Sequence, residues 1–200
     1  MTNHKIIFYG DSNTYGFDPR GFSGGRYPDE HIWTSLLSES LGPDWVIVNE
    51  GMNGRRIPFP GRYDYVERLL EDLGENDYFA IMLGSNDILM TEGSDAEIPI
   101  RHMDSFLKWL TARYDSANII VIAPIYAGSA DAYEQVYRHF HEESIRMNEG
   151  FSELAGQYGC VFLDASGWGV ETAYDMLHFS ENGHRIFAEN LFRSLDFSGV

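Results

Sequence analysis

The residue types that acyl transfer requires occur at four separate places in the chain. Ser12 follows an apolar run that ends at Gly10, and a serine at such a turn is a candidate nucleophile. A serine hydroxyl is weakly nucleophilic at its ordinary pKa and needs a base, a role that the pKa of histidine suits. His178 is the candidate base, and Asp175, three residues earlier, can accept a hydrogen bond from its other ring nitrogen. Taken alone, the turn at Ser12 slightly favours a helix cap or a closed turn over a nucleophile, because Asp, Ser and Asn commonly play those roles.

Acyl transfer also needs hydrogen-bond donors for the oxyanion that develops during attack. The candidates are the backbone N–H groups of Ser12 and Gly51 and the side-chain amide of Asn86. Gly51 lies in the glycine-rich segment 49–54 after the second apolar run, and its lack of a side chain would let substrate approach the backbone. Asn86 follows the third apolar run, so the carboxyl ends of three strands can bring these groups together.

Residues beside these segments are candidates for binding substrate; they are Asp11, Asn13, Arg55, Asp87 and Phe179. Asp11 can instead bond nearby N–H groups of its own turn. Asp87 either fixes its loop or supports the site from behind. These two roles for Asp87 carry similar weight on the sequence alone.

Arginines and aromatic residues in the loops have two interpretations. Arg55, Arg56 and Arg62 follow Gly51 and can bind an anionic group of a substrate, although pairing with some of the 31 acidic residues is more common. Four aromatic residues near the expected strand ends either line an acyl pocket or pack within their loops; they are Phe17, Tyr27, Phe59 and Tyr126.

The other histidines are weaker candidates for a base or a metal ligand. His184 falls inside the expected last helix, where a surface or packing role is more common. The rest show no paired carboxylate pattern and are expected at the surface; they are His4, His31, His102, His139 and His141. Segment 139–143 lacks the i, i+4 spacing that places two ligands on one helical face, so no metal site is expected.

Length and composition favour one globular domain over residues 1–200, with 44% hydrophobic residues. The formal net charge of -17 argues against a nucleic-acid partner and against docking on an anionic membrane. No apolar stretch is long enough to cross a bilayer and the first residues do not resemble a signal peptide, so a cytoplasmic protein without membrane insertion is expected. The single cysteine, Cys160, excludes an internal disulfide and is expected to be buried. The chain lacks a G-x-G-x-x-G after its first apolar run and lacks a P-loop, so no cofactor is expected.

The elements that position these residues alternate between strands and helices. Short apolar runs typical of strands buried on both faces cover 5–10, 45–49, 78–84, 118–124 and 160–164. Between them, apolar residues recur at helical spacing, as in the i, i+3, i+4, i+7 pattern that begins at Val66, and a last helix is expected over 181–195. The alternation predicts an α/β sandwich with a mostly parallel sheet. Irregular stretches over 17–30, 53–62 and 89–99 are long enough to be functional loops.

The chain resembles the SGNH hydrolase superfamily, also called GDSL-like esterases, in four blocks that occur in the family's order. The blocks are Gly10-Asp11-Ser12, Gly51 in Asn-Glu-Gly-Met-Asn-Gly, Gly84-Ser85-Asn86-Asp87, and Asp175-x-x-His178. The resemblance implies a flavodoxin-like, three-layer α/β/α fold with a five-stranded sheet. It also implies that the four residues after which the superfamily is named are Ser12, Gly51, Asn86 and His178, with Asp175 third in the triad.

Two details refine the resemblance. Asn13 stands where many members have leucine, at a position that flanks the nucleophile. The Thr14-Tyr15-Gly16 continuation and the short chain are similar to the small bacterial arylesterase and acyltransferase branch.

We therefore expect a serine esterase that hydrolyses short-chain acyl esters through an acyl-enzyme, with water or another alcohol as the acceptor. Acetylated sugars, lysophospholipids and thioesters are alternative substrates for the same site, and a non-catalytic binding module is the alternative from another class. The expected partner is a small-molecule ester. A homo-oligomer is compatible with the resembled branch, whose small members are often multimers, and loops 17–30 and 53–62 are where a second subunit would shape the pocket.

Overall fold

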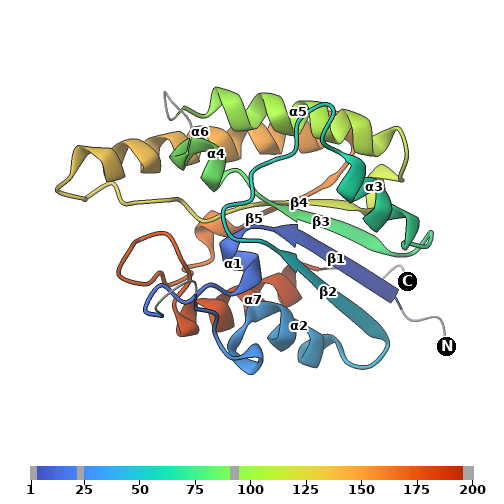
Figure 1. Cartoon of the computed structure of the whole chain (residues 1–200), viewed down its shortest axis with the longest axis horizontal. Helices are drawn as coiled ribbons and strands as arrows, with labels where there is room; N and C mark the ends of the chain where they lie inside the picture. The colour runs from blue at the N-terminus through green and yellow to red at the C-terminus, as the bar shows by residue number, and fades with distance from the viewer. Residues whose placement is uncertain (1–3, 22–24, 91–94, 196–200) are drawn as a thin grey trace.

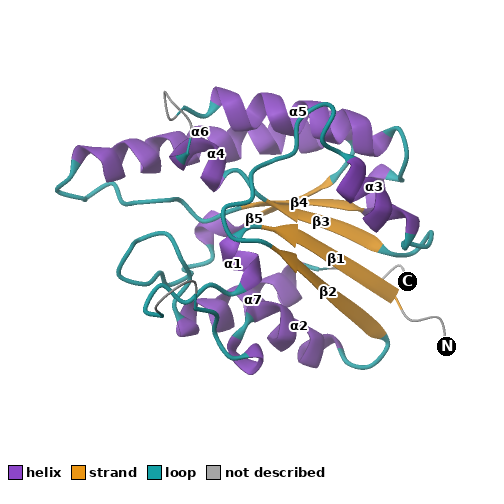
Figure 2. Cartoon of the chain, in the orientation of Figure 1, coloured by secondary structure: helices purple, strands orange, loops and turns teal. Residues whose placement is uncertain are grey.

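The structure, a computed structural model, describes residues 4–21, 25–90 and 95–195. Within them, parallel strands form a five-stranded sheet in the order β2-β1-β3-β4-β5 (Figure 2). The strands are β1 (His4–Gly10), β2 (Trp45–Gly51), β3 (Tyr78–Met82), β4 (Ile119–Ala123) and β5 (Val161–Asp164). This is the order of flavodoxin-like sheets, in which the winding direction reverses beside β1. The expected α/β class and parallel sheet are confirmed.

Helices cover both faces of the sheet and complete the three layers (Figure 1). One face packs against α3 (Asp64–Glu71), α4 (Ser85–Leu89), α5 (Glu97–Thr111) and α6 (Gln135–Tyr158). The other face packs against α2 (Trp33–Leu41) and α7 (Glu181–Ser194). A single turn of helix, α1 (Ser12–Tyr15), directly follows β1.

The core consists of two apolar layers, one on each face of the sheet. Ile7 and Tyr9 of β1 belong to the layer under α5 and α6, whereas Ile6 and Phe8 belong to the layer over α2 and α7. Successive strand residues point to opposite faces, so a strand that is covered on both faces reads as a continuous apolar run. The helical stripe of α5 that begins at Met103 is fully buried against the first layer.

The sheet register decides which loops meet. β1 pairs with both β2 and β3, and Gly10 lies beside Gly51 on one side and beside Met82 on the other. Because these strands run parallel, the turns that follow them leave the sheet at the same edge, where α/β proteins bind ligands. The turn that carries the candidate nucleophile Ser12 and the loops that carry Gly51 and Asn86 therefore converge at this edge.

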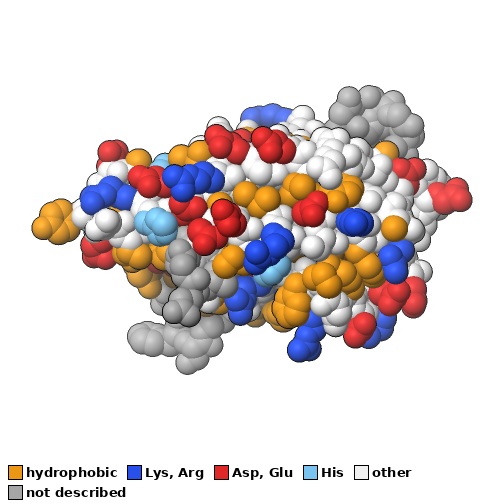
Figure 3. Space-filling view, turned by 90° about the horizontal axis from the view of Figure 1, so that it is seen from above, with side chains coloured by type: hydrophobic (Ala, Val, Ile, Leu, Met, Phe, Trp, Pro, Cys, Tyr) orange, Lys and Arg blue, Asp and Glu red, His pale blue; other side chains and the backbone are white. Residues whose placement is uncertain are grey.

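The predicted strand limits differ from the observed ones by at most two residues. β3 ends earlier than predicted because Gly84, with a φ of 122°, turns the chain into α4. On the face seen from above, which α5 and α6 form, acidic, basic and apolar side chains are interspersed (Figure 3). No helix among the described residues combines the length and apolarity that crossing a bilayer requires.

Candidate active site

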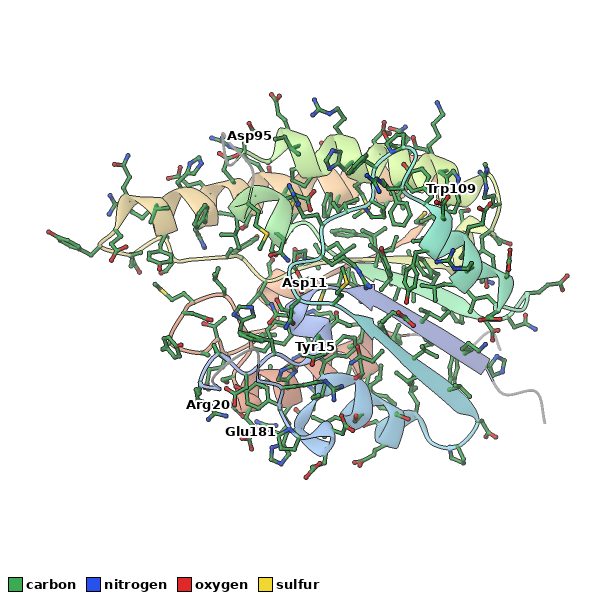
Figure 4. All side chains as sticks on the ribbon, in the orientation of Figure 1. Asp11, Tyr15, Arg20, Asp95, Trp109 and Glu181 are labelled. Carbon is green, nitrogen blue, oxygen red and sulfur yellow. The ribbon has the colours of Figure 1, made fainter. Side chains whose placement is uncertain are left out.

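The turn after β1 that carries the candidate nucleophile Ser12, called the nucleophile turn below, is held by Asp11. Asp11 caps α1, and its Oδ1 accepts a hydrogen bond from the Asn13 N–H at 2.9 Å. Ser12 is the first residue of this helical turn, so its N–H has no intrahelical acceptor. Figure 4 shows Asp11 at the carboxyl end of β1, where the sheet meets α1. The local sequence thus places a serine hydroxyl, and a backbone N–H that no intrahelical carbonyl accepts, at the edge of the sheet.

The histidine turn between β5 and α7 brings His178 to this serine. His178 Nε2 lies 3.0 Å from Ser12 Oγ, although 166 residues separate them in sequence. On the other side of the ring, Nδ1 lies 2.6 Å from Asp175 Oδ2. The structure thus brings Ser12, His178 and Asp175 into one continuous hydrogen-bonded series.

Asp175 is held as a carboxylate by its own turn. Its Oδ1 accepts hydrogen bonds from the N–H groups of Leu177 at 3.1 Å and of His178 at 3.0 Å. Burial alone would raise the pKa of Asp175, but the hydrogen bonds from His178 and Leu177 outweigh it and lower the pKa below its usual range. A carboxylate in this state can orient the imidazole and stabilise its protonated form.

Asn86, at the start of α4, lies beside the same serine turn. Its Nδ2 donates to the backbone carbonyl of Arg55 at 3.1 Å and lies 3.5 Å from Asp11 Oδ2. Burial raises the pKa of Asp11 to about 6, against the smaller lowering effects of the Asn13 N–H and of the nearby His178 and Arg55. The two contacts of Asn86 Nδ2, with the Arg55 carbonyl and with Asp11 Oδ2, fix the orientation of its amide at the wall of the cavity.

The structure gives a different physical reason for a glycine at position 51 than the close approach of substrate expected from the sequence. The Gly51 N–H already donates to Asn49 Oδ1 at 2.9 Å, and Gly51 does not line the cavity. A glycine is needed there because a Cβ would overlap the backbone of Thr14 and Tyr15 in α1. The residue allows close packing of the helix rather than close approach of a substrate.

Gly54, three residues later in the same segment, has the properties expected of Gly51. It lines the cavity, its φ is 72°, and its N–H donates to none of the described residues. The signal in the sequence was the second glycine of segment 49–54. Nothing in that sequence distinguishes the two glycines, because the difference depends on where the Asn49 side chain lies.

The cavity at this edge has a volume of about 390 Å³. Its polar wall consists of Asp11, Ser12, Asn13, Asn53, Gly54, Ser85, Asn86 and His178. Its apolar wall consists of Phe17, Leu89, Met90, Ile125, Ala127, Phe140 and Leu177. The described parts of all three irregular stretches contribute to it, and residues 22–24 and 91–94 of those stretches lie outside the described residues. The apolar wall was not predicted residue by residue, since it depends on loop packing.

Three residues that were expected to bind substrate do not line this cavity: Arg55, Asp87 and Phe179. Arg55 is buried, and its Nη1 donates to the backbone carbonyls of Gly10 and Glu50. Phe179 is buried and packs on Phe187. Both side chains support the site from within the fold.

Asp87 is fully buried and fixes a loop. Its Oδ2 accepts a hydrogen bond from the Ile57 N–H at 3.0 Å, and its Oδ1 lies 3.1 Å from His102 Nδ1. Burial raises the pKa of Asp87, and the contacts with Ile57 and His102 partly oppose that effect. The loop-fixing interpretation of Asp87 is the one its contacts support.

The expectation that the remaining histidines lack carboxylate partners is wrong for two of them. His102 pairs with Asp87, and His31 lies 3.2 Å from Glu181. Each pair joins two separate elements, so the local spacing of residues in the sequence does not predict these ion pairs. His184 is buried among aromatic rings, which is the packing role expected for it.

Of the four loop aromatics, Phe17 lines the cavity, and its ring centroid lies 4.6 Å from that of His178. Tyr27 is buried, Phe59 packs near His102, and Tyr126 packs against His141.

Cys160 is partly buried, and burial raises the pKa of its thiol to about 11, which makes it a poor nucleophile. Among the described residues, no group of three or more His, Cys, Asp or Glu side chains is arranged to hold a metal ion.

A flavodoxin-like sheet with a serine, a histidine and an aspartate in hydrogen-bonded series at its carboxyl edge has the arrangement of a serine hydrolase. The chain belongs to the GDSL-like lipase/acylhydrolase family, whose model its sequence matches over residues 8–186. The expected membership of the SGNH superfamily is thereby confirmed, and the protein is a carboxylic ester hydrolase.

Solved structures share this fold. The M. smegmatis aryl esterase has a TM-score of 0.78 and 21% identity, with 96% of this chain and 97% of that chain covered. Est24, a carbohydrate acetylesterase from Sinorhizobium meliloti, has a TM-score of 0.78 and 20% identity, with 96% and 98% covered. A carbohydrate acetylesterase family member from the same organism has a TM-score of 0.77 and 24% identity, with 96% of each chain covered. A comparison with curated proteins finds no match.

Proposed function

We propose that the protein hydrolyses short-chain acyl esters through an acyl-enzyme on Ser12. The observation that carries this proposal is the unbroken series from Ser12 Oγ to His178 Nε2, at 3.0 Å, and from His178 Nδ1 to Asp175 Oδ2, at 2.6 Å. Such a series lets the imidazole take the serine proton while the carboxylate stabilises the imidazolium that results.

In the first half of the reaction, Ser12 Oγ attacks the ester carbonyl and His178 Nε2 takes the hydroxyl proton. The carbonyl oxygen becomes an oxyanion, which the N–H groups of Ser12 and Gly54 and the side-chain amide of Asn86 stabilise. Asn86 keeps its bond to the Arg55 carbonyl and gives up its long 3.5 Å contact with Asp11 Oδ2 for the oxyanion. The tetrahedral intermediate then expels the alcohol, which leaves with the proton from His178. Asn86→Ala is expected to lower kcat by about 100-fold or more, the usual effect of removing one such donor.

In the second half, a water molecule attacks the acyl-enzyme. His178 takes a proton from this water and then returns it to Ser12 Oγ as the acid leaves. An alcohol in place of water would give acyl transfer by the same steps. Asp175 keeps the imidazole in one orientation throughout, and its lowered pKa keeps it ionised.

The cavity favours a neutral, compact ester. No basic side chain other than His178 lines it among the described residues, and the one carboxyl group there belongs to Asp11. Its volume of about 390 Å³ lies at the small end of ligand pockets. Its apolar wall suits an alkyl or aryl group, so short acyl esters of aryl or alkyl alcohols are the proposed substrates.

Acetylated sugars are the second candidate. The amide and hydroxyl side chains of Asn53 and Ser85 at the cavity can hydrogen-bond to sugar hydroxyls. Lysophospholipids and long-chain thioesters are less suited to a cavity of this size. The cytoplasmic location, the single domain and the homo-oligomer stay predictions from the sequence.

The test compares the purified protein with its Ser12→Ala variant on p-nitrophenyl acetate. We expect steady turnover that falls by at least about 1,000-fold in the variant, because a triad without its nucleophile loses most of its catalysis. A fluorophosphonate probe should label the wild type at Ser12 and leave the variant unlabelled. Equal rates in the two proteins, with no labelling, would overturn the proposal in favour of a binding module.

Substrate class is then decided by two series. Esters with lengthening acyl chains should show kcat/KM falling once the chain outgrows the cavity. A panel of acetylated sugars should be hydrolysed more slowly than phenyl acetate. The reverse order of rates would favour the carbohydrate acetylesterase.

A further inference from the structure

The side chain of Asn13 bridges the nucleophile turn and the histidine turn. Its Nδ2 donates to the Leu177 carbonyl at 3.1 Å, and its Oδ1 accepts from the Phe179 N–H at 2.9 Å. The two groups lie immediately before and after His178, and the Phe179 contact spans 166 residues of sequence. One side-chain amide therefore hydrogen-bonds to the backbone on both sides of the candidate base.

The opposite edge of the same backbone is held by the histidine turn itself. The His178 N–H donates to Asp175 Oδ1 at 3.0 Å, and its carbonyl accepts from the Ala173 N–H at 2.7 Å. Thr172 and Phe179 form an antiparallel bridge that closes this turn. These bonds fix His178 relative to Asp175, but they do not fix it relative to Ser12.

Asn13 is itself rigidly placed. Its N–H donates to Asp11 Oδ1 at 2.9 Å, and its carbonyl accepts from Trp33 Nε1 at 2.9 Å. Trp33 is fully buried in α2, and Asn13 is 9% exposed. Asn13 is thus held firmly within the fold. Because it directly follows Ser12, its contacts with the histidine turn fix the position of that turn relative to Ser12.

We propose that Asn13 is a positioning residue that holds His178 Nε2 within hydrogen-bond reach of Ser12 Oγ. This inference rests on the proposed serine-esterase function and deepens it. Asn13 was expected to bind substrate, and it does line the cavity. Its amide oxygen and one amide hydrogen are nevertheless already engaged by the histidine turn, so its role is to orient the base.

In this chain, the two backbone groups that meet Asn13 need one donor and one acceptor. Aspartate has the same shape but only acceptors, so it would keep the bond from Phe179 and repel the Leu177 carbonyl. Leucine would leave both backbone groups without a partner. Asparagine satisfies both groups in a single amide orientation.

The experiment uses Asn13→Asp, with Asn190→Asp as the matched control. Asn190 lies in α7, away from the cavity, and its Nδ2 donates to the Ile186 carbonyl at 2.8 Å, so the control also removes an amide-to-carbonyl bond. In Asn13→Asp, kcat for p-nitrophenyl acetate should fall by about 10- to 100-fold while KM stays within about twofold, as for a misplaced catalytic group. In Asn190→Asp, kcat should equal that of the wild type.

A second readout does not depend on turnover. The short Nδ1–H···Asp175 bond should give a low-field proton resonance for His178 in the wild type and in Asn190→Asp. In Asn13→Asp, the resonance should shift, because the Nδ1–H···Asp175 bond remains while His178 Nε2 loses its hydrogen bond with Ser12 Oγ on the other side of the ring. Asn13→Leu should behave likewise, and if it does not fold, the near-isosteric Asn13→Asp decides the question.

Two outcomes separate the inference from the proposed function. If Asn13→Asp keeps both the kcat of the control and an unchanged His178 resonance, Asn13 does not position the base and the inference is wrong. If the wild type neither hydrolyses esters nor reacts with a fluorophosphonate, the proposed function fails. The His178 resonance still shows in that case whether Asn13 holds the histidine turn.

Discussion

The guanidinium carbon of Arg55 lies 4.2 Å from the centroid of the Tyr9 ring. Its Nη1 donates to the backbone carbonyls of Gly10, the last residue of β1, and Glu50, the next-to-last residue of β2. The Arg55 carbonyl in turn accepts the hydrogen bond from Asn86. One buried arginine therefore ties two strand ends to the loop that carries Gly54.

Arg55→Met is expected to lower the free energy of unfolding by about 2–4 kcal/mol. The substitution removes the guanidinium donor from the Gly10 and Glu50 carbonyls, although Gly10 still accepts from the Met52 N–H, and it removes the cation–π contact with Tyr9. Each loss costs about 1–2 kcal/mol. Urea unfolding measures the change, and Arg62→Met, at an exposed position, is the control. Equal stability of the two variants would show that Arg55 does not hold the strand ends.

Gly51→Ala and Gly54→Ala should differ sharply in stability. The Cβ at Gly51 would overlap the backbone of Thr14 and Tyr15, and overpacking of this kind costs about 1–3 kcal/mol or more. At Gly54 the Cβ would make an ordinary 3.6 Å contact with Met90 Cε, leaving mainly the cost of a positive φ, about 1–2 kcal/mol. Thermal unfolding of both variants tests this order, and a less stable Gly54→Ala would contradict it.

Acid should destabilise the protein through His184. Burial, with a smaller effect of the Arg26 charge, lowers the pKa of His184 from 6.5 to about 3. The unfolded chain therefore binds a proton between those values and the folded chain does not, so stability is present above 6.5 and is lost as the pH falls toward 3. His184→Phe should lack this loss, which amounts to about 2–3 kcal/mol between about pH 7 and about pH 4.5.

The measurement for His184 is the difference in unfolding free energy between wild type and variant at the two pH values. Comparing the two proteins cancels the contributions of the other titrating groups. A His184→Phe variant that loses as much stability in acid as the wild type would exclude His184 as the cause.

Asp11 should act in the opposite direction. Burial raises its pKa from 3.8 to about 6, so the folded protein holds this proton more tightly than the unfolded chain. The stability that this proton provides is complete below 3.8 and is lost as the pH rises through about 6. Asp11→Asn keeps an acceptor for the Asn13 N–H and removes the charge. Relative to the wild type, it should gain about 1–2 kcal/mol between about pH 5 and about pH 8, measured by urea unfolding, and a constant difference would refute this.

Local pattern in the sequence was sufficient for the elements and for part of the site. The apolar runs predicted the strands because both faces of a parallel sheet are buried, and the spacing of Asp175 and His178 predicted their contact because it fits within one turn. Both signals arise within a few residues of chain. The order of the blocks then indicated that Ser12, Asn86 and His178 belong to one site.

Tertiary structure decided everything that depends on which side chain reaches across from another segment. The Asn49 side chain accepts the hydrogen bond of the Gly51 N–H, and Gly54 rather than Gly51 lines the cavity, where we propose it as a donor. Asp87 meets His102 on another helix, and Asn13 meets the backbone on both sides of His178. The physical reason is that propensity and periodicity report local geometry and burial, whereas a hydrogen bond between distant segments depends on how the layers pack.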